Sequence, residues 1–385
     1  MSELSYLEKL LDGVEVKWLP LGEITKYEQP TKYLVKAKDY HDTYTIPVLT
    51  AGKTFILGYT NETHGIYQAS KAPVIIFDDF TTANKWVDFD FKAKSSAMKM
   101  VTSCDDNKTL LKYVYYWLNT LPSEFAEGDH KRQWISNYSQ KKIPIPCPDN
   151  PEKSLAIQSE IVRILDKFTA LTAELTAELT AELNMRKKQY NYYRDQLLSF
   201  KEGEVEWKTL GEVAQFKRGT AITQKQTTPG EIPVVANGPI PTYFHSESNR
   251  QGETIVIARS GAYAGYVSFW NQPIFLTDAF SVHSDLKIVK PKFIYHVLQN
   301  KQEHIHAMKK GAGVPHVRVK EFETYDIPIP PITEQERIVS ILDKFDTLTN
   351  SITEGLPREI ELRQKQYEYY RDLLFSFPKP ETVSK

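Results

Sequence analysis

Apolar residues recur at spacings of three and four in the middle of the chain, from residue 152 to residue 200, with no glycine or proline between them. This periodicity predicts one continuous helix, roughly 70 Å long at about 1.5 Å per residue. A helix of that length cannot bury its apolar stripe against one small domain. We therefore expect a second long helix over 332–377 to pack along it, with a kink or break at Gly355 and Pro357.

Runs on either side of the middle helix predict two mixed regions. Runs rich in β-branched and aromatic residues predict strands, and runs with an apolar stripe predict short helices. The expected strands lie at 46–49, 73–77, 232–235, 254–258 and 266–270, and the expected helices at 110–121 and 291–300. The proline-rich run at 143–146 predicts an extended linker, because proline lacks the amide donor that a helix or a central strand needs.

The second half of the chain repeats the first. IVRILDKF at 161–168 returns as IVSILDKF at 338–345, and QYNYYRD at 189–195 returns as QYEYYRD at 366–372 with the same spacing. A repeat of this size predicts a pseudo-symmetric molecule. Residues 6–11 resemble the end of the middle helix, which makes the repeat circular and favours an antiparallel pair of long helices. The tyrosines of the QYxYYRD blocks are predicted to pack the helices, although a groove for partner subunits stays open as an alternative.

These patterns together predict an α+β fold, with two mixed α/β domains separated by two long antiparallel helices in a coiled coil. The expected domains are 1–151, which starts with a short helix tail, the central helix 152–203, the second mixed domain 204–331, and the C-terminal helix 332–385. The residues expected to form the helix contact are Ile161, Leu165, Phe168, Leu175, Leu179, Ile338, Leu342 and Phe345.

Composition narrows the class of protein. Hydrophobic residues make up 41% of the chain and charged residues 25%, which is typical of a globular protein. No apolar run approaches the roughly 18 residues of a membrane span, and the N-terminus lacks a signal core, so we expect a cytoplasmic protein. The two cysteines, Cys104 and Cys147, form no CxxC motif, and no metal site is expected.

The charge of the chain is unevenly distributed. The net charge of −1 argues weakly against a nucleic-acid binder, yet between residues 207 and 326 Lys and Arg outnumber Asp and Glu by 14 to 10. Cationic side chains in Gly-rich loops can approach phosphates, and arginine can read guanine with two hydrogen bonds. The candidate DNA-binding residues of this region are Lys217, Arg218, Thr220, Arg259, Ser260, Tyr263, Lys309, Lys310, His316 and Arg318.

Within this set, Arg259 and Arg318 are the expected base readers, and Lys309 and Lys310 are expected at phosphates. The candidates in the first region are Lys53, Lys92, Lys94, Lys131 and Arg132. For every one of these residues the competing interpretation is a solvated surface side chain.

Catalytic motifs are missing from the chain. LTAGKT at 49–54 resembles the end of a phosphate-binding loop, but Pro47 stands where that motif needs a glycine. No strand–GxGxxG–helix unit and no nucleophile elbow is present. We expect no catalytic residue, no metal and no cofactor in this chain.

The tract LTAELTAELTAEL at 171–183 repeats a tetrapeptide three times. One interpretation is a filler of high helix propensity. The other is a ruler: four residues add about 6 Å and about 40° of rotation to a helix, and one base pair adds roughly 3.4 Å to the DNA axis. One TAEL unit could then change the distance between two half-sites by about one base pair.

The circular repeat, the ILDKF and QYxYYRD blocks, the IPIP runs and the TAEL tract resemble the specificity subunit of type I restriction–modification enzymes, closest to the IC-type branch. The resemblance covers nearly the whole chain. It implies two target-recognition domains, each reading one part of a bipartite, asymmetric site in double-stranded DNA, with the spacer set by the helices.

The same resemblance implies partners that carry the chemistry. Two modification subunits would hold S-adenosylmethionine and methylate adenine, and two restriction subunits would use ATP and Mg²⁺. This chain would be the non-catalytic reader in the bacterial cytoplasm. The rival hypotheses are a coiled-coil scaffold that holds two protein-binding domains without DNA, and an enzyme whose motifs are not recognisable.

Overall fold

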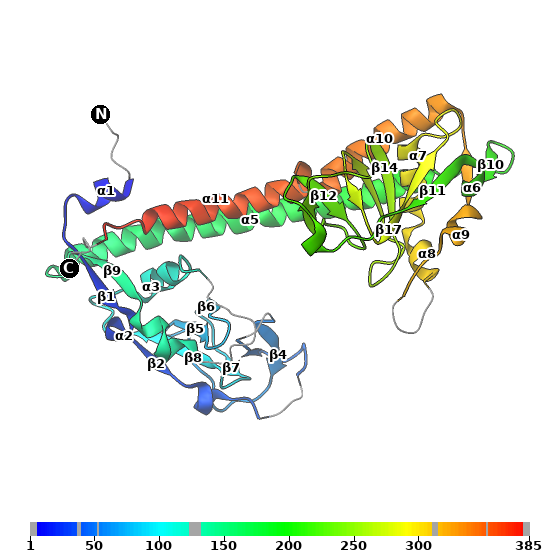
Figure 1. Cartoon of the computed structure of the whole chain (residues 1–385). Coiled ribbons are helices and arrows are strands. Elements are labelled where there is room, and N and C mark those ends of the chain that lie inside the picture. The colour runs from blue at the N-terminus through cyan, green and yellow to red at the C-terminus, as the bar shows by residue number, and fades with distance from the viewer. Residues whose placement is uncertain are drawn as a thin grey trace. The chain divides into compact units, whose positions relative to one another are not determined.

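The computed structural model describes residues 6–36, 40–51, 54–122, 132–309, 315–351 and 353–379. The chain forms two compact units (Figure 1). The first comprises Met1–Ala177 and Glu361–Lys385, and the second comprises Glu178–Ile360. These units divide the chain inside its long helices, so the domain borders expected at residues 151, 203 and 331 stay predictions.

The middle of the chain is one helix, α5, which spans Pro151–Leu197, as the periodicity predicts. The C-terminal helical segment is interrupted where the sequence predicts it: α10 spans Ile332–Asn350 and α11 spans Gly355–Leu374. Gly355 has a φ of +78°, and a Cβ there would lie 2.5 Å from the carbonyl oxygen of Thr347. Only glycine fits this turn without strain.

The first unit is built around an antiparallel four-stranded sheet of order β2-β8-β5-β6. These strands are Thr25–Glu28, Met98–Ser103, Val74–Asp78 and Asn84–Val87. A second sheet has the order β4-β3-β7, with Ile56–Thr60, Ile46–Leu49 and Lys92–Ala93. Its helices are α1 (Tyr6–Leu11), α2 (Leu21–Ile24), α3 (Leu111–Leu118) and α4 (Gln133–Ser136).

The second unit repeats this plan with the strand order β11-β17-β14-β15. These strands are Ala214–Arg218, Ala279–Ser284, Glu253–Ala258 and Val267–Asn271. The smaller sheet, β13-β12-β16, uses Tyr243–His245, Ile232–Val235 and Phe275–Leu276. Its short helices are α6 (Leu210–Val213), α7 (Pro291–Asn300), α8 (Gln302–Ala307) and α9 (Val319–Glu323).

The proline-rich runs are strands, which corrects the prediction of a linker. β9 (Lys142–Pro146) pairs with β1 (Val16–Pro20), and β18 (Asp326–Ile329) pairs in the same way with β10 (Glu206–Thr209). Each ribbon has only two strands, so every strand keeps an outer edge. A proline whose missing donor faces that edge leaves the ladder intact.

The long helices hold the short domain helices by a repeated glutamine clasp. Gln158 of α5 is fully buried, and its Oε1 accepts the amide of Leu110, which caps α3, at 2.9 Å. Gln335 of α10 is equally buried and accepts the amide of Lys290, which caps α7, at 2.9 Å. Each glutamine thus satisfies one of the amide groups that a helix start leaves without a partner.

A second clasp joins the same helices through the aspartate of the ILDKF blocks. Asp166 Oδ1 accepts the hydroxyl of Tyr116 at 2.5 Å and pairs with Lys112 at 2.9 Å. Asp343 Oδ1 contacts His296 Nε2 at 2.7 Å and Lys292 at 3.1 Å. The two clasps are alike except that a tyrosine in the first unit is a histidine in the second.

Four of the expected helix-pairing residues have another role. Ile161 and Leu165 are fully buried in the core of the first unit, with residues of its sheet and of α3, and Ile338 and Leu342 are buried in the core of the second. Ile161 and Leu165 therefore pack with α3 in the core of the first unit, and Ile338 and Leu342 pack with α7 in the core of the second.

The aromatic residues of the same blocks do pack the helices. In the first unit Phe168 of α5 stacks on Tyr370 of α11, with ring centroids 5.3 Å apart. In the second unit Phe345 of α10 stacks on Tyr190 and Tyr193 of α5. Leu175 and Leu179 are half-buried on α5. The predicted packing role of the QYxYYRD tyrosines is confirmed at these three positions.

Candidate nucleic-acid interface

Predicted residues from three separate segments meet in the second unit. Arg218 ends β11, Arg259 and Ser260 follow β14, and His316 and Arg318 precede α9. All five line a cavity of about 620 Å³, together with Phe280 and Lys320. We call the members with basic side chains, Arg218, Arg259, His316, Arg318 and Lys320, the basic cluster.

Strand pairing brings these segments together. β17 lies between β11 and β14, and its first residues pair with the last residues of both: Phe280 with Arg218, and Ala279 with Ala258. The segment before α9 then joins the end of β14, since the amide of Val317 donates to the carbonyl of Arg259 at 2.9 Å. Residues far apart in the sequence thus share one edge of the sheet.

Gly219 allows the end of β11 to approach its neighbour. A Cβ at this position would lie 1.9 Å from the carbonyl oxygen of Thr277 and 2.6 Å from that of Leu276, so no larger residue fits. The amide of Thr220 donates to the carbonyl of Leu276 at 2.8 Å. A second cavity of about 610 Å³ adjoins this turn, and Arg218 and Arg259 line it as well.

The guanidinium of Arg259 is anchored by an acid. Its Nε donates to Asp278 Oδ1 at 2.9 Å, and the two side chains are 47% and 38% exposed. Burial raises the pKa of Asp278, but hydrogen bonds from Ser260 and Asn237 and the charge of Arg259 outweigh it and lower that pKa below its ordinary value. Asp278 is therefore a carboxylate at neutral pH.

The remaining predicted residues of the second unit lie around this edge. Lys217, Thr220 and Tyr263 are exposed, and Tyr263 is 51% exposed. Lys309 is half-buried, and its Nζ donates to the carbonyl of Ala262 at 2.9 Å. Lys310 lies outside the described residues. Lys217, Thr220, Tyr263 and Lys309 do not line the cavity of the basic cluster.

The predicted cations of the first unit do not form a comparable group among the residues that the structure describes. Lys92 is only 2% exposed, pairs with Glu62 at 3.0 Å and donates to the carbonyl of His64 at 2.6 Å, so its prediction as a DNA contact is wrong. Lys94 is half-buried with its Nζ over the ring of Tyr40. Arg132 is exposed directly before α4. Lys53 and Lys131 lie outside the described residues.

Comparison with known proteins decides the family. The family model for the type I restriction modification DNA specificity domain matches residues 13–185 and again residues 202–362. The chain belongs to this family. The two matches are the internal repeat, and they agree with the two units that share one strand order.

Two relatives of this specificity subunit match over nine-tenths or more of its length. It is 70% identical to the EcoR124I/EcoR124II specificity subunit of Escherichia coli, with all of both chains covered. It is 38% identical to the EcoprrI specificity subunit of Escherichia coli, over 92% of this chain and 93% of the relative. The assignment to the IC-type branch stays a prediction.

Two solved structures share the fold. The S subunit of a type I restriction–modification system from M. genitalium gives a TM-score of 0.58 at 17% identity, over 96% of this chain and 98% of the other. A chain from work on complex assembly and conformational transition of the type I R-M system gives a TM-score of 0.56 at 15% identity, over 94% and 97%.

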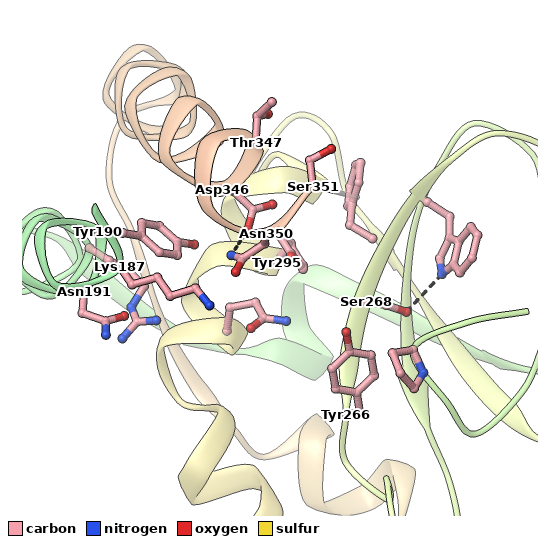
Figure 2. Close-up of a pocket in the computed structure, with 15 residues that line it drawn as sticks. Lys187, Tyr190, Asn191, Tyr266, Ser268, Tyr295, Asp346, Thr347, Asn350 and Ser351 are labelled. Atoms are coloured by element: carbon pink, nitrogen blue, oxygen red, sulfur yellow. Dashed lines mark hydrogen bonds between the residues drawn. The ribbon is translucent and has the colours of Figure 1, made fainter. Parts of the chain in front are cut away.

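A different pocket of the specificity subunit surrounds Tyr190 of the first QYxYYRD block. Figure 2 shows this cavity of about 760 Å³, lined by residues of α5, α7, α10 and β15, with Lys187, Tyr295 and Asp346 pointing into it. Burial raises the pKa of Tyr295 and of Tyr190. No predicted DNA-binding residue that the structure describes lines this pocket, and the stacking of Tyr190 on Phe345 assigns its ring to helix packing.

Sequence reasoning missed three residues at the basic cluster. Lys320 lines its cavity and follows Arg318 by two positions, so the basic run itself was a usable signal. Arg250 braces the end of β11, since its Nη2 donates to the carbonyl of Arg218 at 2.8 Å and its Nε donates to Ser281 at 2.7 Å. Asp278 anchors Arg259. The sequence around the last two residues carries no pattern that points to these contacts.

The described residues offer neither a metal-binding cluster nor a membrane-spanning helix. No group of three His, Cys, Asp or Glu side chains among them could hold a metal ion. None of their helices is long and apolar enough to cross a bilayer.

Proposed function

We propose that the basic cluster is the surface with which the second unit of this specificity subunit reads double-stranded DNA. The observation that carries the proposal is the convergence of Arg218, Arg259 and Arg318 on one cavity from three separate segments. Arginine binds phosphates and reads guanine with paired donors. Lys217, Thr220, Tyr263, Lys309 and Lys310 are proposed to contact the flanking backbone.

We further propose that the first unit reads a second, different half-site, so that the complete site is bipartite and asymmetric. Two units with one frame and different side chains at the same edge support this proposal. Lys53, Lys94, Lys131 and Arg132 are the proposed contacts of the first unit, and Lys92 is no longer among them.

The chemistry is proposed to belong to partner subunits. Two modification subunits would bind S-adenosylmethionine and methylate the site, and two restriction subunits would use ATP and Mg²⁺, in the bacterial cytoplasm. This chain would direct both reactions without a catalytic residue or cofactor of its own. The name of the 70% identical relative, a type I restriction enzyme specificity subunit, supports this assignment.

The TAEL tract is proposed to set the spacer between the half-sites. The tract lies wholly within α5, and none of its residues belongs to the hydrophobic core of either unit. Removing one unit shortens the helix by about 6 Å. We expect the spacer to shorten by about one base pair while both half-sites persist.

Methylation mapping in cells tests these proposals together. Cells carry the modification subunits with the intact chain, with a chain that lacks one TAEL unit, or with Arg259→Ala. We expect split sites, a shorter spacer for the second chain, and relaxed or lost recognition in one half-site for the third. Split sites with an unchanged spacer would refute the ruler alone. An absence of site-specific methylation with a competent partner would favour the protein-binding scaffold.

A further inference from the structure

An acid borders the basic cluster. Asp278 lies beside Arg218 and Arg259 in the second cavity. A carboxylate next to a DNA-binding surface repels phosphates and lowers the affinity for any DNA. The contacts of Asp278 indicate why the acid is nevertheless placed there.

Both oxygens of Asp278 are engaged by neighbouring segments. Oδ1 accepts Arg259 Nε at 2.9 Å, while Oδ2 accepts the hydroxyl of Ser260 at 2.5 Å and the amide nitrogen of Asn237 at 2.9 Å. Asn237 follows β12, Ser260 follows β14, and Asp278 precedes β17. Donors from two other segments therefore hold the carboxylate in one orientation, and the carboxylate in turn holds Arg259.

The bond to Nε determines which edge of the guanidinium stays available. Arginine has five N–H donors in a planar fork, and a partner on Nε leaves the edge formed by the two terminal nitrogens. Among the described residues, no hydrogen bond to the terminal nitrogens of Arg259 is found. Two parallel donors on that edge match O6 and N7 of guanine.

We propose that Asp278 is a positioning residue that directs Arg259 toward a base and thereby sets the base preference of the second unit. The inference rests on the proposed role of Arg259 as a reader. It also gives another role to Ser260, a predicted DNA-binding residue: its hydroxyl donates to Asp278 and helps to position the acid. Fixing the long Arg259 side chain before DNA arrives reduces the conformational entropy lost on binding.

A change of charge without a change of shape separates positioning from simple electrostatics. The test uses the complex of this chain with its modification subunits. The probes are one duplex that carries a site mapped for the unaltered complex and one in which the second half-site is scrambled. We expect Asp278→Asn to lower the affinity for the mapped site by roughly tenfold, the size of one base contact. The affinity for the scrambled duplex should stay the same or rise, because a repelling charge is gone.

The opposite pattern would overturn the proposal. If Asp278 were only a negative charge near DNA, Asp278→Asn would strengthen binding to both duplexes alike. Glu247→Gln, an equal charge change at an exposed residue of the same unit, is the matched control and should leave the ratio of the two affinities unchanged. Ser260→Ala keeps the charge of Asp278 and should lower the ratio by a smaller factor.

A double-mutant cycle distinguishes this inference from the proposed function. If Asp278 acts through Arg259, Asp278→Asn adds no further loss of specificity in an Arg259→Ala background. A specificity loss for Arg259→Ala but none for Asp278→Asn would refute the positioning role and leave Arg259 as a reader. No specificity loss for Arg259→Ala would refute the reader itself. Hydrogen exchange of β14 and β17 shows whether each variant remains folded.

Discussion

The sheets of the two units have the same strand order but opposite chemistry at the same edge. In the first unit Ile75 of β5 pairs with Val101 of β8, and in the second Ile255 of β14 pairs with Val282 of β17. Asp79 lies four positions after Ile75, and Arg259 lies four positions after Ile255. The two residues therefore occupy equivalent positions just beyond β5 and β14. The repeat therefore preserves the frame of the sheet and not the side chains at its edge.

The backbone around these two residues is also the same. The amide of Gln133 donates to the carbonyl of Asp79 at 2.8 Å, just as the amide of Val317 donates to the carbonyl of Arg259. Yet the side chain of Asp79 is 1% exposed and pairs with buried Lys99 at 3.4 Å. Arg132 precedes Gln133 and therefore lies at this edge. Of the predicted DNA-binding cations of the first unit that the structure describes, only Arg132 is next to a residue of this edge.

This difference teaches that a shared fold does not imply a shared reading surface. In the second unit the charged pair at the edge, Arg259 and Asp278, is half exposed and can contact a ligand. In the first unit the pair is buried and holds the N-terminal side of α4, because Asp79 Oδ1 accepts the amide of Trp134 at 2.8 Å. One position is thus proposed to serve recognition in one unit, while in the other it holds a helix and a buried ion pair.

The largest expected effect comes from breaking the buried pair of the first unit. Asp79→Ala removes the acid partner of Lys99, which is buried in the core, and this costs about 3–5 kcal/mol of unfolding free energy. Asp278→Ala in the second unit removes a half-exposed pair and should cost about 1 kcal/mol or less. Chemical denaturation measures the loss of unfolding free energy for each variant, and hydrogen exchange shows which unit has lost stability. Equal losses for the two variants would contradict the comparison.

The next largest effect is expected at the glutamine clasps, which the two units have in common. Gln158→Leu and Gln335→Leu each leave the amide at the start of a domain helix and neighbouring carbonyls without a buried partner, which costs about 1–3 kcal/mol. Because the clasp is repeated, we expect similar losses of hydrogen-exchange protection in α3 and α7. A loss in one helix alone would show that the clasps are not equivalent.

A smaller effect is expected from pH in the second unit. Burial raises the pKa of Asp343, but hydrogen bonds from His296 and Lys292 outweigh it and lower that pKa. A carboxyl whose pKa is lowered by folding stabilises the protein above its ordinary pKa of about 3.9, and that contribution is lost as the pH falls through the lowered value.

We therefore expect hydrogen-exchange protection at the contact of α7 with α10 to fall at the acid end of the pH range. Asp343→Asn should remove this dependence by weakening the contact at neutral pH, and Asp346→Asn on the same helix is the control. A pH profile that Asp343→Asn leaves unchanged would show that another group is responsible.

The local pattern of the sequence was sufficient for part of the fold. The single helix α5, the interruption before Gly355, the helix α7 and the repeat all follow from periodicity, glycine and proline, which act over a few residues. Strands such as β8 and β17 were not predicted, and the IPIP runs were predicted as linkers, because pairing with a partner strand was needed to form them. A partner strand is a long-range contact that composition does not reveal.

The candidate site depended much more on tertiary structure. The sequence marked Arg218, Arg259 and Arg318 as basic residues in loops, but only the pairing of β11, β17 and β14 brings them to one cavity. Lys92 was marked by the same criterion and is buried against Glu62. A lysine in a polar run has the same sequence appearance whether water or a carboxylate surrounds it.

By itself, the amino-acid sequence determined the repeat, the long helices and the family, because hydrophobic periodicity and motif spacing are properties of neighbouring positions. Tertiary structure alone decided that Ile161 and Ile338 face the domains, that Asp278 holds Arg259, and that Asp79 is buried at the equivalent edge. Such contacts join residues tens of positions apart, and their energy depends on distance and burial, which exist only after the chain has folded.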